Sequence, residues 1–217
     1  MTFFEALIAY ADTYGSIIPL VVLSIVFHKR KVPKTLLPLV FYLFISVIVF
    51  GFSNYLADRK INNLFLYNIF SAIELALILY FFHGIIKNPK IRKWILPVIL
   101  LYLILLTGNL MFLEKINSFN SNALAIEFLF LIIFCFSYYY ELSSSEEVIV
   151  FLKTPYFWMV SGFFIYFSTC ILVFVLYKYA AIQNRKFILD FWEFQVIMYL
   201  IKNILIAKGL LCFKTPT

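Results

Sequence analysis

The sequence predicts an all-α polytopic membrane protein: a bundle of seven transmembrane helices with the N-terminus outside and the C-terminus in the cytoplasm. Of the 217 residues, 64% are hydrophobic and only 13% are charged, whereas a soluble domain carries about 25% charged residues. The mean hydropathy is +0.97. Seven apolar stretches are each long enough to cross a bilayer, and most of the 18 basic residues then fall on one side of it.

The seven stretches follow one another along the whole chain. A hydrocarbon core requires about 20 predominantly apolar residues in a helix. Windows of this length predict helices at 7–27, 36–57, 64–86, 94–113, 122–141, 156–177 and 190–211. Polar residues dilute the first window, Asp12 among them. Because domains seldom have fewer than about 50 residues, the connections are too short for a second one, and residues 1–217 are expected to form a single transmembrane domain.

The orientation follows from the basic clusters between the windows. Those at 29–34 and 87–93 lie on the side that also receives the C-terminus, and smaller ones at 59–60 and 185–186 lie on the other side. Because basic loops are retained in the cytoplasm, the first side is predicted to be cytoplasmic. This distribution accounts for the net charge of +7 without a nucleic-acid partner. The expected partner is the lipid bilayer.

The connection between the fifth and sixth windows carries a capping pattern. Ser144 and Glu147 have the spacing of a capping box, which predicts a short helix on the cytoplasmic face. Such a helix could dock a cytoplasmic signalling partner, although packing of the loop against the bilayer is the simpler interpretation.

Two opposite charges lie deep within the windows. Counted from the predicted outer ends at 1.5 Å per residue, Glu74 is about 15 Å and Lys202 about 18 Å down. An isolated charge is costly at bilayer depth, and ionisable residues there are candidates for functional sites with a partner. We therefore predict a buried ion pair between Glu74 and Lys202. It could be purely structural, but buried charges seldom improve stability over apolar packing, which favours a functional role.

Polar residues at helical spacing extend this pair toward the outside. Tyr67, Ser71 and Glu74 are spaced i, i+4, i+7, and Gln195, Tyr199 and Lys202 repeat the spacing. Each set therefore lies on one helix face, which we expect to turn inward. The predicted ligand vestibule consists of Tyr67, Ser71, Glu127, Trp192, Gln195, Tyr199 and Asn203.

Acidic residues near the predicted outer ends suggest a vestibule for a cation or an amine. They are Asp12, Glu127, Asp190 and Glu193. For Asp190 and Glu193 the competing interpretation, a solvated acid at a helix N-terminus, is preferred. For Asp12 and Glu127 the two interpretations stand equal, because both lie further inside an apolar window.

Other residue types predict packing rather than chemistry. Gly51, Gly108 and Gly162 are expected at close contacts between helices. His28 and His83 have no second ligand nearby, so no metal site is expected, and no cofactor is implied. No HExxH, GxSxG or paired-aspartate motif is present, so no catalytic residue is assigned and enzymatic activity is not expected.

Four passages carry a resemblance that covers nearly the whole chain: 66–74, 119–127, 157–168 and 202–205. They resemble a family of bacterial seven-helix inner-membrane proteins without a known activity, which implies the bacterial inner membrane as the location. A lysine in the seventh helix opposite an acid in the third is also remotely similar to rhodopsin-type proteins. However, Met198 stands where microbial rhodopsins have Asp, and residues 64–86 contain no Arg.

The function that these observations favour is a sensor or receptor in which the Glu74–Lys202 pair governs two arrangements of the helices. The alternative is a transporter for a small solute or a proton-coupled substrate, which would use the same charges as a relay. An intramembrane enzyme acting on lipid, with Glu74 or Glu127 as general base, ranks third. Seven helices without a catalytic domain would require a separate cytoplasmic effector.

Overall fold

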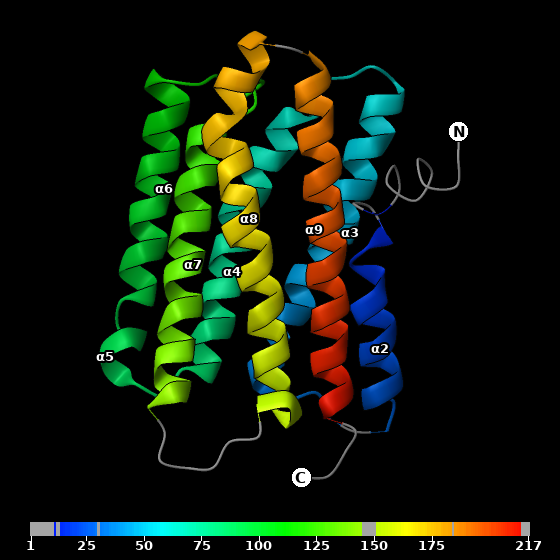
Figure 1. Cartoon of the computed structure of the whole chain (residues 1–217), viewed down its shortest axis with the longest axis vertical. Helices are drawn as coiled ribbons and strands as arrows, with labels where there is room; N and C mark the ends of the chain where they lie inside the picture. Colours follow the sequence, from blue (N-terminus) through cyan, green and yellow to red (C-terminus); the bar gives the residue numbers. More distant parts are fainter. Residues whose placement is uncertain (1–10, 12–13, 30, 145–150, 184, 214–217) are drawn as a thin grey trace.

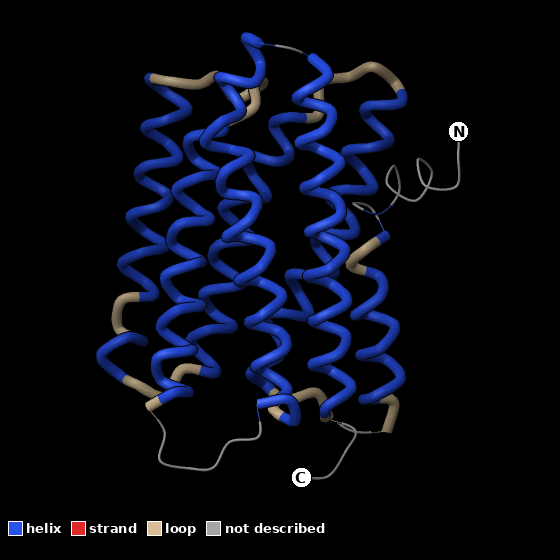
Figure 2. The backbone as a smooth tube through the Cα atoms, viewed as in Figure 1, coloured by secondary structure: helices blue, strands red, loops and turns tan. Residues whose placement is uncertain are grey.

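The computed structural model describes residues 11, 14–29, 31–144, 151–183 and 185–213. Within these residues the regular structure is entirely helical, and the helices run side by side along a common axis (Figure 1, Figure 2). Connections 59–63 and 113–120 lie at the end drawn uppermost in Figure 1, here called the upper end. Connections 31–33 and 86–88 lie at the opposite, lower end.

Among the described residues, six helices are long and apolar enough to cross a membrane, which confirms the prediction of a helical, multi-pass membrane protein. Their boundaries lie close to six of the predicted windows, because the apolar runs end where charged and polar residues begin. Helices α8 and α9 continue beyond their windows, since the backbone is helical at 178–183 and at 185–189 as well. The six helices are α3 (Leu37–Asp58), α4 (Leu64–Ile85), α6 (Ile95–Phe112), α7 (Ser121–Ser143), α8 (Pro155–Gln183) and α9 (Arg185–Cys212). A short helix, α5 (Pro89–Arg92), precedes α6.

The first predicted window is described only in part. Helix α2 (Ile17–Phe27) has 11 residues, a length of about 16 Å, roughly half of a hydrocarbon core about 30 Å thick. It packs against α9 and α3. Asp12 lies outside the described residues, as does Glu147 of the predicted capping box; residues Phe151–Lys153 form a single 3-10 turn.

The described helices form one bundle around a core rich in aromatic rings. Helix α8 packs against α7 and α9, α4 packs against α3, α6 and α7, and α2 covers part of α9. Phe81, Phe82, Phe163 and Phe167 are fully buried. Large apolar side chains on the outward faces, such as Ile104 on α6, are exposed, as expected for contact with lipid.

Glycine at position 162 allows α8 and α9 to approach closely. A Cβ added to Gly162 would lie 2.8 Å from the carbonyl oxygen of Lys202 and 3.2 Å from Cβ of Leu205. The predicted close contact is therefore confirmed for Gly162. The same prediction is wrong for Gly108, where nothing lies within 4 Å of an added Cβ, because this face of α6 meets no neighbouring helix.

A carboxylate ties α7 to the end of α4. At the lower end, Glu141 accepts hydrogen bonds from the backbone N–H of Lys87 at 2.7 Å and of Asn88 at 3.0 Å. The side chain of Asn88 in turn accepts from the N–H of Lys90 at 2.9 Å and caps α5. One side chain of α7 thus holds the corner between α4 and α5.

Candidate functional site

The two deep charges are joined through a tyrosine. The ammonium of Lys202 on α9 donates to the hydroxyl of Tyr42 on α3 at 2.5 Å. That hydroxyl donates to Oε1 of Glu74 on α4 at 2.9 Å. Lys202 and Tyr42 are 0% exposed and Glu74 is 7% exposed. The structure thus brings Glu74 and Lys202 into one buried cluster with Tyr42 between them, in place of the direct contact expected from matching depths.

Aromatic rings surround the ammonium group of Lys202. Its Nζ lies 4.0 Å from the ring centre of Tyr199, 4.4 Å from that of Tyr166 and 5.1 Å from that of Tyr42. A cation within about 6 Å of a ring centre gains about 0.5–2 kcal/mol from the electrons of the ring face, with the larger values at desolvated sites. Three rings and one hydroxyl therefore replace the water that the ammonium would otherwise bind.

Tyr42 is the member of this cluster that the sequence did not predict. It lies in the second apolar window, and tyrosine in a membrane protein is commonly found at the membrane–water interface. Its position more than one turn inside that window, however, is deeper than an interfacial ring requires. This depth is the only feature of the sequence that could have indicated a buried hydroxyl.

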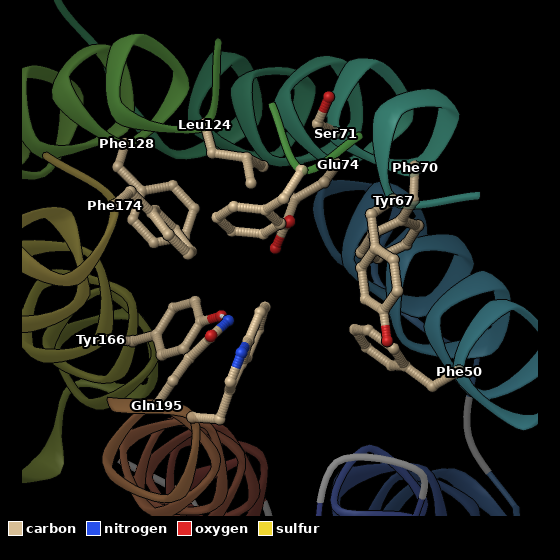
Figure 3. A pocket seen from close by; sticks show the side chains of 12 residues that line it. Phe50, Tyr67, Phe70, Ser71, Glu74, Leu124, Phe128, Tyr166, Phe174 and Gln195 are labelled. Carbon is tan, nitrogen blue, oxygen red and sulfur yellow. Dashed lines mark hydrogen bonds between the residues drawn. The ribbon is translucent and has the colours of Figure 1, made fainter. Parts of the chain in front are cut away.

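A cavity lies beside this cluster, between α3, α4, α7, α8 and α9 (Figure 3). The empty space here is about 390 Å³, and an adjoining space of about 360 Å³ shares Phe50, Tyr67, Tyr166, Trp192 and Gln195; both figures include space that is open to solvent. The carboxylate of Glu74 points into the cavity in Figure 3. The lining comprises Phe50, Tyr67, Phe70, Ser71, Glu74, Phe119, Leu124, Phe128, Tyr166, Phe174, Trp192 and Gln195, with Val196 and Tyr199 in the adjoining space.

Most residues of the predicted vestibule surround this cavity. Tyr67, Ser71, Trp192 and Gln195 line it, and Tyr199 lines the adjoining space. Since Phe119 belongs to the connection between α6 and α7, the cavity extends toward the upper end. A role in binding a ligand stays a prediction for each of them.

The remaining predicted residues lie elsewhere. Asn203 is fully buried; its Nδ2 donates to the backbone oxygen of Tyr199 at 3.0 Å, and its Oδ1 has no hydrogen-bond partner among the described residues. Glu193 is exposed, in agreement with the interpretation as a solvated acid. The side chain of Asp190, like Asp12, lies outside the part of the chain that can be described.

Glu127 on α7 is buried at the edge of the cluster. Its side chain is 0% exposed, and among the described residues neither carboxyl oxygen has a hydrogen-bond partner of regular geometry. The hydroxyl of Tyr102 lies near enough for a hydrogen-bonding interaction with it, but that hydroxyl donates to Ser71 Oγ at 2.9 Å. Glu127 also interacts electrostatically with Glu74, so it belongs to the surroundings of the cluster although it does not line the cavity.

Hydroxyl groups extend the cluster to α2. Ser46 on α3 donates to Ser16 at 2.8 Å, and Ser16, which precedes α2, shares a hydrogen bond of 2.5 Å with the hydroxyl of Tyr199. The ring of Tyr199 in turn lies over Lys202. The network therefore connects α2, α3, α4 and α9.

Comparison with protein-family models, with curated proteins and with solved structures gives no match for this chain. The resemblance to bacterial seven-helix inner-membrane proteins therefore stays a prediction, and the argument for function depends on the site alone.

Proposed function

We propose that the protein is a sensor or receptor of the seven-helix type, with its N-terminus outside and its C-terminus in the cytoplasm of a bacterium, in the inner membrane. A small ligand enters the cavity from the upper end and changes the contacts between Glu74, Tyr42 and Lys202. A cytoplasmic partner responds to the resulting movement of the helices. One observation carries the proposal: the carboxylate of Glu74 belongs both to the lining of the cavity and to the buried cluster.

The cluster is suited to such a role because each of its three members comes from a different helix. Tyr42 on α3 is hydrogen-bonded both to Glu74 on α4 and to Lys202 on α9. A ligand that takes one carboxylate contact from Tyr42 weakens the link between α3 and α4 and changes the field at Lys202. A ligand shifts an equilibrium between two arrangements only by its difference in affinity for them, and this contact supplies such a difference.

Distances between spin labels test the link between the cluster and the helix arrangement. We suggest labels at Tyr80 on α4 and Leu211 on α9, which are 62% and 44% exposed, in a Cys212→Ser background. Glu74→Gln and Lys202→Met are expected to shift the distance distribution in nanodiscs. Glu193→Gln serves as control, since it removes a charge at an exposed site of α9. Distributions identical to wild type in both cluster variants would show that the cluster does not govern the arrangement.

The proposed topology is tested by labelling with a membrane-impermeant thiol reagent. Asn117 and Lys93 are exposed at opposite ends of the bundle. In intact cells, Asn117→Cys is expected to react and Lys93→Cys is expected to react only after the membrane is opened. The reverse pattern would invert the orientation and place the cavity toward the cytoplasm.

A proton-coupled transporter is the second candidate, and the pairing of Glu74 with Glu127 favours it. The two carboxyl groups interact electrostatically, one facing the cavity and the other buried without a regular hydrogen bond among the described residues. Carboxyl groups at membrane depth commonly belong to proton relays. Proton flux into proteoliposomes that contain a pH-sensitive dye decides between the two candidates. A flux in the wild type that disappears in Glu74→Gln supports a transporter. No proton flux in the wild type supports the sensor.

A further inference from the structure

The walls of the cavity are made largely of aromatic rings. Phe119 lies against Trp192 with ring centres 5.2 Å apart, and Phe128 lies against Tyr166 at 5.4 Å. Phe50 continues the wall on the α3 side, 6.0 Å from Tyr67 and 5.3 Å from Phe70. Ring faces carry partial negative charge and attract cations, with Trp and Tyr the strongest among them.

The polar atoms of the lining add acceptors from opposite sides. Glu74 projects from α4, and only one of its oxygens is used by Tyr42 within the described residues. Gln195 projects from α9; its Nε2 donates to the Tyr166 hydroxyl at 3.3 Å, and its buried Oε1 has no hydrogen-bond partner in the described part of the chain. Figure 3 shows both side chains pointing into the space between the helices. A buried acceptor without a partner costs free energy, which a donor on a ligand would recover.

The single charge in the lining is negative. Lys202 does not line the cavity, and its ammonium is held behind the wall by Tyr42, Tyr166 and Tyr199. An anion would therefore meet the carboxylate of Glu74 directly, and a neutral solute could gain only a hydrogen bond from it. A cation gains from the carboxylate and from the rings at the same time.

We propose that the cavity binds a small organic cation of the alkylammonium class, with Glu74 as counter-charge and Trp192, Tyr67 and Tyr166 as its aromatic walls. The proposal rests on the proposed function, since it assigns the ligand class of that same site. It also explains how binding acts on the cluster. A cation at Glu74 competes with the hydroxyl of Tyr42 for the carboxylate and repels the ammonium of Lys202 behind it.

Choline and 3,3-dimethylbutan-1-ol provide a matched pair of probes, because they have nearly the same shape and differ in charge. Binding is measured by calorimetry and by the rise in unfolding temperature, in a maltoside detergent that carries no choline headgroup. We expect choline to bind wild type at least tenfold more tightly than the alcohol. Glu74→Gln is expected to lower this preference several-fold, and Glu193→Gln, which removes an exposed acid of α9, is expected to keep it.

Three results would overturn the proposal: equal affinities of the two probes, no binding of either to folded wild type, or an equal loss in Glu193→Gln and Glu74→Gln. If Glu74→Gln does not fold, Trp192→Leu takes its place, because removing this ring should weaken choline at least threefold and leave the alcohol unchanged. Equal weakening of both probes by Trp192→Leu contradicts a cation site.

The same probes separate this proposal from the sensor function. If choline binds through Glu74 but leaves the distances between labels at positions 80 and 211 unchanged, the cation site stands and the sensor role is wrong. If neither probe binds while Glu74→Gln and Lys202→Met still shift those distances, the cluster governs the arrangement and the ligand belongs to another class.

Discussion

Replacing Tyr42 by Phe removes one oxygen atom from the centre of the bundle and leaves the ring in place. The hydroxyl makes two hydrogen bonds, one to the carboxylate of Glu74 and one from the ammonium of Lys202. Hydrogen bonds between membrane helices contribute about 0.6–1.7 kcal/mol each, so losing two costs about 1–3 kcal/mol. In this variant the ammonium of Lys202 keeps its three ring contacts but loses the Tyr42 hydroxyl. Complete loss of the partner of a buried charge costs about 3–5 kcal/mol, which sets the upper limit. We expect Tyr42→Phe to lower the free energy of unfolding by about 2–5 kcal/mol.

Tyr102→Phe is the matched control for this experiment. Tyr102 is also 0% exposed, and among the described residues the regular hydrogen bond of its hydroxyl is the one to the neutral hydroxyl of Ser71 at 2.9 Å. Its loss is expected to cost about 0.5–1.5 kcal/mol. Reversible unfolding in mixed micelles, titrated with a denaturing detergent, measures both variants. A loss in Tyr42→Phe no greater than in Tyr102→Phe would refute the central place given to the Tyr42 hydroxyl.

Two further predictions concern packing and burial. Gly162→Ala should lower the free energy of unfolding by about 1–3 kcal/mol more than Gly108→Ala does. Of these two positions, only at Gly162 does the new methyl meet a neighbouring backbone oxygen, at 2.8 Å. Both variants gain the same helix propensity, so equal unfolding free energies would contradict the close contact. Glu127→Met should raise the free energy of unfolding by about 1–3 kcal/mol, because it replaces by apolar atoms two buried oxygens that have no regular hydrogen bond among the described residues. A loss measured in the same titration would mean that the carboxyl has a stabilising partner, such as the nearby Tyr102 hydroxyl.

Hydropathy located the helices well but gave no information about how each one is rotated. The apolar windows agree with six spanning helices, because the same exclusion of charge that marks a window also ends it. Glu74 and Lys202 could be placed at one depth from the rise of a helix alone. The hydrogen bonds that connect them could not be predicted, since these depend on which face of α3 turns inward and places Tyr42 between them.

The candidate site was predicted in part for a similar reason. The spacing of Gln195, Tyr199 and Lys202 identified one helix face correctly, because a repeat of i, i+4, i+7 fixes relative angles within a helix. Asn203 follows Lys202 directly, which places it about 100° away around the helix, and its amide bonds back to α9 rather than facing the cavity. The aromatic walls could not be found this way, since the chain has 27 Phe and 15 Tyr and composition does not distinguish rings that face a cavity from those that face lipid.

The carboxylate of Glu141 has a mechanical consequence for any movement of the bundle. By accepting hydrogen bonds from the N–H groups of both Lys87 and Asn88, it couples the connection that follows α4 to the last turn of α7. We therefore expect a displacement of α4 that starts at Glu74 to be transmitted to the end of α7, at the lower end of the bundle.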